Sequence, residues 1–261
     1  MQQNLISLKD IHLTFNKGTV NEQELFKGFN LDINKGEFVS VVGSNGSGKT
    51  TMLNLICGTL FAQSGQILLE GKDISHMPEY RRAKRIGRVF QDPAKGTCPE
   101  LTILENLSLA DNKGKSFNLT KGVNLARKDY YRELLSQLEM GLEDKLDVLV
   151  GSLSGGQRQA LALIISTMTP IDLLILDEHT AALDPKSSEK VMELTLKAIE
   201  EKQLTALMVT HNLRFAVEYG TRLIMMHEGH SVIDSLGHNK ADYRIEDLLK
   251  VFNEISIECG N

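Results

Sequence analysis

The stretch Glu37-Phe-Val-Ser-Val-Val-Gly43 is rich in β-branched residues, and Ser44-Asn-Gly-Ser-Gly-Lys-Thr50 follows it without a break. The first run predicts a buried strand that ends at a glycine. The residues from Gly48 to Cys57 predict a helix. A strand, a glycine-rich turn and a helix therefore follow one another directly, as in α/β proteins.

The residues from Gly43 to Thr50 fit the pattern G-x-x-x-x-G-K-[ST] in the strand-to-helix context that it requires. Glycines let successive backbone N–H groups surround phosphate oxygens, and the start of the helix adds its positive end. Lys49 suits the β- and γ-phosphates, and the Thr50 hydroxyl suits Mg²⁺. The sequence predicts a nucleoside triphosphate site that comprises Gly43, Ser44, Asn45, Gly46, Ser47, Gly48, Lys49, Thr50 and Thr51.

The rest of the chain alternates between strand and helix patterns around one polar, helical stretch. We expect strands at about 5–15, 24–33, 66–70, 85–90, 172–177 and 205–210, and helices at about 101–109, 126–140, 157–167, 187–201 and 212–219. The second of these helices should bury Tyr130, Leu134, Leu135 and Leu138. The alternation favours a largely parallel sheet covered by helices, interrupted by a helical subdomain.

The composition is that of a soluble globular chain: 261 residues, 41% hydrophobic and 24% charged, with a net charge of −5. An acidic chain is a poor candidate for nucleic-acid binding, and the basic run 81–88 is interpreted as a solvated face. The 3 cysteines are widely spaced, which disfavours disulfides and zinc sites and favours a reducing cytosol. No membrane span or export signal is recognisable.

Two further segments carry chemistry. Asp177 and Glu178 end the strand pattern Leu-Leu-Ile-Leu, where α/β folds place ligands; Asp177 suits Mg²⁺ held through its water shell, and Glu178 suits polarisation of an attacking water. Alone, the pair could equally be the polar end of a strand. In Leu153-Ser-Gly-Gly-Gln157, Ser154 is a predicted N-cap and the glycines expose helix N–H groups, which makes a second anion site. Two chains arranged head to tail could share such sites.

With these motifs in this order, the chain resembles the ATP-binding subunit of ABC transporters over essentially its whole length. The resemblance implies a P-loop NTPase fold, the ABC-type ATPase core, in which N-terminal antiparallel strands join a mostly parallel sheet. One ABC ATPase domain would span 1–261, with the α/β core at about 1–90 and 170–261. The helical subdomain with the signature motif would occupy about 91–169.

The resemblance also assigns roles to individual residues. It implies that Phe15 stacks on adenine, that Gln91 contacts Mg²⁺ and senses the membrane subunit, and that residues 181–184 cross a dimer interface. His211 would contact the γ-phosphate and the catalytic Glu178. The implied metal ligands are Thr50, Gln91 and Asp177, and the implied nucleotide contacts of the signature are Ser154, Gly155, Gly156 and Gln157.

The residues of the motifs, with His179 in place of the commoner proline, are similar to those of a narrower group. This group comprises the ATPases of bacterial importers for tryptophan, tyrosine or related small solutes, which are encoded beside a lipoprotein-like binding protein. This implies an ATP- and Mg²⁺-dependent homodimer on the cytoplasmic face of the membrane. It would dock to integral membrane permease subunits, act indirectly with an extracytoplasmic solute-binding protein, and bind no nucleic acid. The permease would dock in a groove between the α/β core and the helical subdomain, near Gln91 and Cys98. Leu101, Ile103 and Leu104 either line this groove or pack the subdomain's own core.

Other functions stay open at this stage. The chain could be the ATPase of an exporter, or a soluble ABC ATPase of translation or DNA repair, although such proteins usually carry two cassettes or a long coiled coil. A nucleotide-gated regulator is disfavoured because Glu178 and His211 are both present. The residues from about 227 onward leave room for a hairpin and one helix, near 244–252, and we expect no substrate-sensing domain and hence no direct inhibition by substrate.

Overall fold

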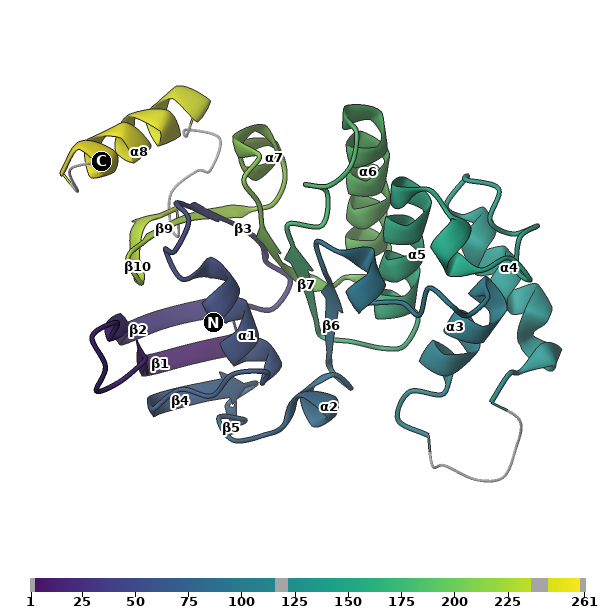
Figure 1. Ribbon diagram of the computed structural model, residues 1–261, viewed down its shortest axis with the longest axis horizontal. Coiled ribbons are helices and arrows are strands. Elements are labelled where there is room, and N and C mark those ends of the chain that lie inside the picture. Colours follow the sequence, from purple (N-terminus) through teal and green to yellow (C-terminus); the bar gives the residue numbers. More distant parts are fainter. Residues whose placement is uncertain (1–2, 116–121, 236–243, 259–261) are drawn as a thin grey trace. The chain divides into compact units, whose positions relative to one another are not determined.

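The computed structural model describes residues 3–115, 122–235 and 244–258 of the chain. It divides into two compact units, each continuous in space. The first comprises Met1–Ala83 and Thr205–Asn261, and the second comprises Lys84–Leu204. Figure 1 gives the labels of the elements. The core and subdomain limits near residues 90 and 170 remain a prediction; both positions lie inside the second unit.

The first unit opens with an antiparallel sheet, as the resemblance implied. Its strands are β1 (Asn4–Phe15), β2 (Gln23–Asn34), β4 (Ser64–Leu69) and β5 (Lys72–Asp73), in the order β2-β1-β4-β5 (Figure 1). Each neighbouring pair is antiparallel. The predicted limits of β1 and β2 agree with the structure to within one residue at each end.

The same unit contains a second set of strands, which includes the strand that leads into the glycine-rich loop 43–50. β3 (Phe38–Gly43) lies between β8 (Thr205–Val209) and β9 (Arg222–His227) and is parallel to both, while β10 (His230–Asp234) pairs with β9 in an antiparallel hairpin. Every residue of β3 is buried, as expected of a parallel strand covered on both faces. This burial explains why its sequence does not alternate between apolar and polar residues, and the one buried hydroxyl, that of Ser40, donates to Tyr219 O.

Helices accompany these strands. α1 (Lys49–Cys57) follows β3, α2 (Glu79–Arg82) is one short turn, α7 (Leu213–Glu218) follows β8, and α8 (Ile245–Glu258) follows the β9–β10 hairpin. Leu248 of α8 is fully buried in a cluster with Val42 of β3 and Ala216 of α7. The predicted hairpin and final helix are therefore confirmed, and the helix extends beyond the predicted end.

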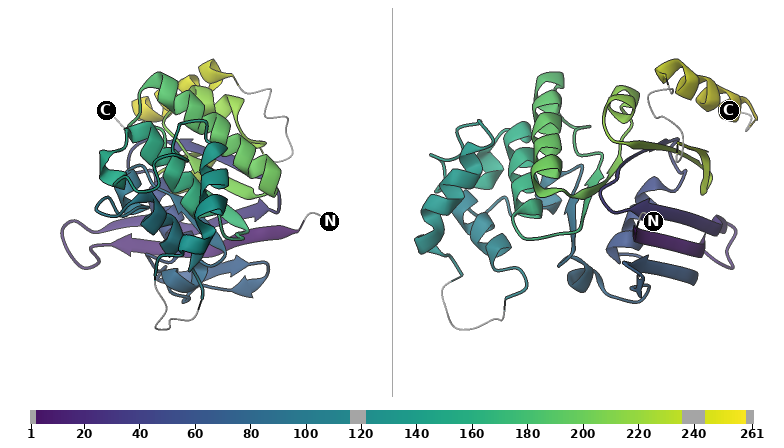
Figure 2. Two further views of the ribbon diagram at one scale, coloured as in Figure 1. Left: turned by 90° about the vertical axis from the view of Figure 1, so that its right-hand side faces the viewer. Right: turned by 180° about the vertical axis from the view of Figure 1, so that it is seen from behind.

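The second unit combines a parallel strand pair with helices. β6 (Ile86–Val89) pairs with β7 (Leu173–Asp177), and the helices are α3 (Ile103–Asp111), α4 (Lys128–Ser136), α5 (Gly155–Thr167) and α6 (Pro185–Lys202). Short 3-10 turns occur at η1 (Pro93–Lys95), η2 (Leu125–Arg127) and η3 (Val150–Ser152). α5 packs against α3, α4, α6 and β6, and it lies beside α6 in both views of Figure 2.

The burial around α4 differs from the prediction at two residues, Tyr130 and Leu134. The buried side chains are Tyr131, Leu135 and Leu138, whereas Tyr130 and Leu134 are only half-buried. The spacing i, i+4 puts Tyr131 and Leu135 on one face of α4, and Leu138 follows just after the end of the helix. The Tyr131 hydroxyl donates to Asp111 Oδ2 at 3.1 Å, and the Arg127 guanidinium lies 4.2 Å from the centre of the Tyr130 ring. The polar tip of Tyr131 thus has a partner that allows burial.

The interpretation of the run 81–88 as a solvated face is wrong for Arg82 and Arg88, while Arg85 is half-exposed and paired. Arg82 is 1% exposed, and it donates to the carbonyl oxygens of Leu55 and Ile56 in the last turn of α1. Arg85 pairs with Asp172, and Arg88 pairs with Asp177. Arg81 and Lys84 are exposed, as predicted. The partners that bury these cations come from distant segments, so the local run of charges does not reveal them.

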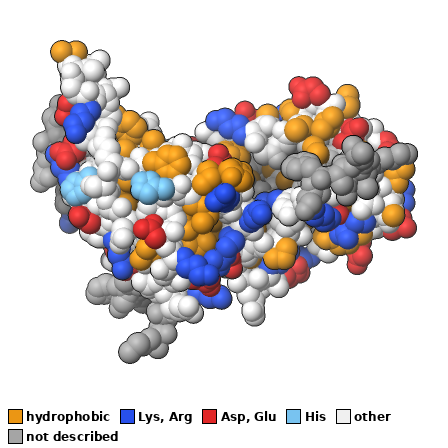
Figure 3. Space-filling view, turned by 90° about the horizontal axis from the view of Figure 1, so that it is seen from below, with side chains coloured by type: hydrophobic (Ala, Val, Ile, Leu, Met, Phe, Trp, Pro, Cys, Tyr) orange, Lys and Arg blue, Asp and Glu red, His pale blue; other side chains and the backbone are white. Residues whose placement is uncertain are grey.

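The surface mixes side chains of all kinds. Hydrophobic, basic and acidic side chains are interspersed on the face drawn in Figure 3. Large hydrophobic side chains that stay exposed include Val20, Tyr80, Leu109, Leu125, Leu149 and Val232. Within the described ranges, no helix combines the length and the apolar character needed to cross a bilayer.

Candidate nucleotide-binding site

The loop between β3 and α1 has the geometry of a phosphate cradle. The Lys49 ammonium is buried and donates to the carbonyl oxygens of Gly43 at 2.8 Å and of Ser44 at 2.9 Å. The loop is closed by a hydrogen bond from Ser47 N to Ser44 O at 3.2 Å. A cation is therefore fixed in the concave side of the loop at the N-terminus of α1, where an anion is favoured.

Two of the loop glycines are required by their surroundings. Gly43 has a φ of 155°, and a Cβ there would lie 2.2 Å from the Met226 carbonyl oxygen of the neighbouring strand β9. Gly48 has a φ of 102°, and a Cβ there would lie 3.0 Å from the ring of Phe26. Side chains at these positions are excluded by both conformation and space. The two glycines thus allow the loop to pack closely against β9 and Phe26.

The turn between β9 and β10 supports this loop from behind, a feature that sequence reasoning missed. Gly229 N donates to Ser47 O at 3.0 Å, and the Ser44 hydroxyl lies 3.4 Å from His227 Nδ1. The sequence Glu228-Gly229 does indicate a tight turn. Its partner segment lies about 180 residues earlier in the chain, and no local pattern connects the two.

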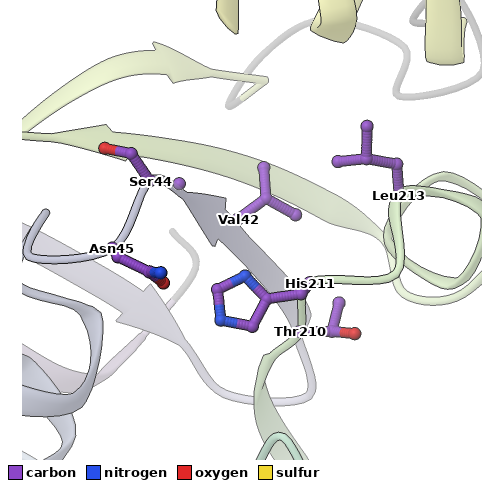
Figure 4. A pocket seen from close by; sticks show the side chains of 7 residues that line it. Val42, Ser44, Asn45, Thr210, His211 and Leu213 are labelled. Atoms are coloured by element: carbon purple, nitrogen blue, oxygen red, sulfur yellow. The ribbon is translucent and has the colours of Figure 1, made fainter. Parts of the chain in front are cut away.

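A pocket of about 280 Å³ opens beside the loop and brings predicted site residues together (Figure 4). His211 stands at its rim, and its imidazole points towards the side of the pocket that contains Asn45 (Figure 4). Asn212, the next residue, caps α7 by accepting from Phe215 N. The described residues that line the pocket are Val42, Gly43, Ser44, Asn45, Thr210, His211 and Leu213.

Phe15 is not among the residues that line this pocket. It lies at the end of β1 opposite Gln23 of β2, and its ring is half-buried. Thr50 is exposed at the start of α1, and Thr51 is half-buried. The predicted stacking of Phe15 on a base therefore remains a prediction.

Within the second unit, two predicted site carboxylates follow one another at the end of β7. Asp177 is buried, and its Oδ2 atom accepts from Arg88 Nη2 at 2.7 Å. Glu178 has a φ of 49°, in the left-handed region that few residues other than glycine adopt. Such backbone strain is frequent at functional sites. The next residue, His179, is fully enclosed.

Gln91 follows β6 and is exposed on the surface of this unit. The segment after it is a capped 3-10 turn, in which Asp92 accepts from Ala94 N. Asn106 then holds the backbone of Cys98 by two hydrogen bonds, of 2.8 and 3.0 Å. Ile103 and Leu104 are buried in the unit, so they pack its own core, as one of the two alternatives predicted.

The predicted N-cap at the signature segment is confirmed. The Ser154 hydroxyl accepts from Gln157 N at 3.3 Å, and the Gln157 side chain accepts from Ser154 N at 3.2 Å. This is a capping box, which satisfies two N–H groups at the start of α5. Gly156 is buried against the start of α6, and a Cβ there would lie 3.1 Å from Ser187. One glycine of the pair therefore serves close packing as well.

The predicted metal ligands have the chemistry that Mg²⁺ prefers. Asp177 and Gln91 in the second unit and Thr50 in the first unit each offer oxygen atoms. In the part of the chain that the structure describes, no three His, Cys, Asp or Glu side chains gather as a preformed metal cage. Nucleotide-linked Mg²⁺ commonly takes only one or two protein carboxylates, with phosphates and water completing its shell, so the residues present are compatible with it.

Comparison with known proteins agrees with the motifs. The family model for ABC transporters matches residues 26–181. The tyrosine transport ATP-binding protein of Clostridioides difficile is 46% identical over 248 residues, which cover 95% of this chain and 98% of that protein. A putative hemin import ATP-binding protein of Staphylococcus aureus is 35% identical over 225 residues, 85% of this chain and 96% of that protein.

A solved structure supports the same assignment. The dimeric ATP-binding cassette MJ0796, in a post-hydrolysis state bound to ADP and phosphate, is 31% identical with a TM-score of 0.74. The match covers 88% of this chain and 97% of that one. With the phosphate loop in place and the family model matching more than half of the sequence, the chain belongs to the ABC transporter family, as an ATP-binding and ATP-hydrolysing subunit.

Proposed function

We propose that the chain works as a head-to-tail homodimer that binds Mg²⁺ and ATP and drives a bacterial importer of tyrosine or a related small solute. One observation carries the choice of solute: the 46% identity, over nearly the full length of both chains, to a protein named for tyrosine transport. The 35% identical relative is named for hemin import, so hemin is the alternative solute to test.

In this proposal the β3–α1 loop holds the phosphates. Backbone N–H groups from Gly43 to Thr51 donate to phosphate oxygens, and the Lys49 ammonium exchanges its bonds to loop carbonyls for bonds to the β- and γ-phosphates. Its position in the concave side of the loop supports this role. Phe15 stacks on the adenine base.

The chemistry of hydrolysis is assigned to two side chains. Glu178 polarises the attacking water, and its backbone strain is of the kind that clusters at functional sites. His211 contacts the γ-phosphate, in keeping with its place in the pocket beside the loop. Thr50, Gln91 and Asp177 would hold Mg²⁺, which, when bound, neutralises charge that develops on the phosphates.

The signature segment acts on the nucleotide of the other chain. Ser154, Gly155, Gly156 and Gln157 present the N-terminus of α5 to the γ-phosphate of the partner's ATP, and the loop 181–184 lies at the dimer interface. The dimeric arrangement of MJ0796 supports this assignment. A two-fold dimer of identical chains then contains two equivalent shared sites.

The dimer is expected at the cytoplasmic face of a bacterial membrane, bound to integral membrane permease subunits. The permease in turn receives the solute from an extracytoplasmic binding protein, and no nucleic acid takes part. Tyrosine uptake tests the solute: the chain is reconstituted with permease subunits in proteoliposomes, with binding protein and labelled tyrosine outside. ATP-dependent uptake by the wild type and none by Lys49→Ala is expected. Hemin uptake without tyrosine uptake, or efflux of the solute, would overturn the assignment.

Sharing of sites is tested by mixing two inactive variants. Lys49→Ala impairs the phosphate loop, and Gly155→Glu impairs the signature. In a heterodimer one site combines the intact loop of one chain with the intact signature of the other. An equimolar mixture should recover about one quarter of wild-type ATPase activity, because half of the dimers contain one intact site of two. Activity that stays at the level of the separate variants would refute a shared site.

A further inference from the structure

Arg88 and Asp177 form a buried ion pair within the second unit. Arg88 Nη2 lies 2.7 Å from Asp177 Oδ2, and the two side chains are only 10% and 12% exposed. β6 and β7 are parallel with Arg88 opposite Ile175, so Asp177 lies two residues further along the same face. The length of the arginine side chain spans this offset. The pair is thus fixed by strand register.

Packing also holds the arginine. Its guanidinium carbon lies 4.6 Å from the centre of the Phe90 ring, an arrangement in which the ring face attracts a cation. The carbonyl oxygen of Arg88 accepts from the Ser166 hydroxyl of α5 at 2.9 Å, which fixes the backbone at this point. The cation is therefore placed before any ligand binds, and its Nη2 atom contacts the carboxylate of Asp177.

A carboxylate that is nearly excluded from water needs a counter-charge. Under the function proposed above, on which this step rests, Asp177 meets Mg²⁺ only when nucleotide is bound. We propose that Arg88 is a positioning residue that takes the place of the metal: it neutralises and orients Asp177 in the nucleotide-free protein, and it competes with Mg²⁺ for that carboxylate. Binding of the metal and pairing with Arg88 are then negatively coupled, and the coupling is reciprocal.

The same strands provide a matched control. Arg85 just before β6 pairs with Asp172 just before β7, but these side chains are 35% and 30% exposed and lie at the opposite end of the strands. Loss of this second pair removes a nearby arginine without affecting the proposed metal ligand. A purely structural role of Arg88 predicts that neither loss changes the response of the protein to Mg²⁺.

Thermal unfolding of the full chain with ADP tests the proposal, in EDTA and in excess Mg²⁺. The Mg²⁺ increment is the difference between the two unfolding temperatures. In EDTA, Arg88→Met should unfold about 5 °C or more below the wild type, because a buried carboxylate loses its partner. Its Mg²⁺ increment should exceed that of the wild type, because the metal replaces the missing charge. Arg85→Met should lose less stability and keep the wild-type increment.

A second readout follows the metal directly. The Mg²⁺ concentration that gives half-maximal change in the fluorescence of a bound ADP analogue should fall about fivefold or more in Arg88→Met and stay unchanged in Arg85→Met. Arg88→Lys keeps a charge and should lie between Arg88→Met and the wild type. Where Arg88→Met does not fold, Arg88→Gln, which keeps hydrogen-bond donors but no charge, enters both measurements in its place.

The outcomes distinguish the competition between Arg88 and Mg²⁺ from the role of Asp177 as a metal ligand. An Arg88→Met protein with the wild-type Mg²⁺ increment and half-saturation overturns the competition between Arg88 and the metal. An Asp177→Asn protein with the same Mg²⁺ increment as the wild type shows instead that Asp177 is not a metal ligand. The proposed function of that residue then fails. An enlarged increment in Arg88→Met that disappears in Arg88→Met/Asp177→Asn supports both.

Discussion

The Nε2 atom of His179 lies 3.3 Å from the hydroxyl oxygen of Thr195 in α6. That hydroxyl donates its own proton to Val191 O at 2.7 Å, so it accepts from His179, and Nε2 carries the proton. Both side chains are buried. Burial lowers the pKa of His179 to about 4, because the charged ring would lose its hydration. A neutral histidine thus anchors the turn after Glu178 to α6.

This buried ring makes stability depend on pH. In the unfolded chain His179 takes up a proton near pH 6.5, whereas in the folded protein it stays neutral down to about pH 4. The unfolded state binds more protons in this window, so the free energy of unfolding falls as the pH is lowered through it. The loss reaches on the order of 2–3 kcal/mol at its acidic end. Above pH 6.5 both states are neutral and His179 has no effect.

Urea unfolding at about pH 7.5 and about pH 4.5 measures this loss. His179→Leu is the control, since a leucine of similar volume removes the titrating group. The variant should lose less stability between the two pH values than the wild type, while acidic residues contribute equally to both proteins. Equal losses in the two proteins would mean that His179 is protonated in the folded state near its ordinary pKa.

Arg82 joins the end of α1 to the turn that precedes α2. Besides the carbonyl oxygens of Leu55 and Ile56, it donates to Met77 O at 2.7 Å and to Ser75 O at 3.0 Å. A cation at the C-terminus of a helix also interacts favourably with the helix dipole. We predict that Arg82→Met destabilises the protein by about 2–4 kcal/mol, because buried carbonyl oxygens lose charged donors.

The neighbouring arginine is the control for this prediction. Arg81 is exposed in the same short helix, and Arg81→Met should change the free energy of unfolding by no more than about 0.5 kcal/mol. Arg82→Lys should not restore stability, because an ammonium cannot present donors in the planar fork of a guanidinium. Denaturant unfolding of the three variants decides the point. Similar stabilities of Arg81→Met and Arg82→Met would show that the hydrogen bonds of Arg82 contribute nothing net.

Local patterns were sufficient for much of the fold and for the phosphate loop. The buried strand 38–43 is apolar except for Ser40, and the glycine-rich pattern after it marks a turn directly in the sequence. The N-cap Ser154 likewise depends only on residues within one turn. The sequence predicts such features because the residue patterns that indicate them are local in the chain.

Long-range partners account for what the sequence did not reveal. The burial of Arg82 depends on the end of α1, and that of Arg88 depends on Asp177, 89 residues later. The support of Ser47 by Gly229 is of the same kind. The choice of Tyr131 over Tyr130 as the buried ring depends on Asp111 of another helix. The residues around a charged or aromatic side chain in the sequence do not identify its partner in the folded protein.

Substitution of Glu178 tests the assignment of the catalytic carboxylate. Glu178→Gln should retain ATP binding and lose hydrolysis by about 10²–10⁴-fold, because an amide cannot polarise water comparably. An ATP-bound dimer should then accumulate on size exclusion, because hydrolysis no longer reopens it. Lys49→Ala should instead weaken nucleotide binding itself. Near-normal turnover of Glu178→Gln in complex with permease subunits would remove Glu178 from this role.

The exposed thiol of Cys98 marks the loop where we expect the permease to dock. Asn106 fixes the backbone of this loop, while the thiol points to solvent, so a new side chain there should not disturb the unit's own packing. Cys98→Arg should therefore leave ATP binding and stability unchanged but lower the yield of the permease complex and transport about tenfold or more, through an unpaired charge in the interface. Val232→Arg, at another exposed hydrophobic position, is the control and should assemble normally. Full transport and complex yield with Cys98→Arg would show that the permease docks elsewhere.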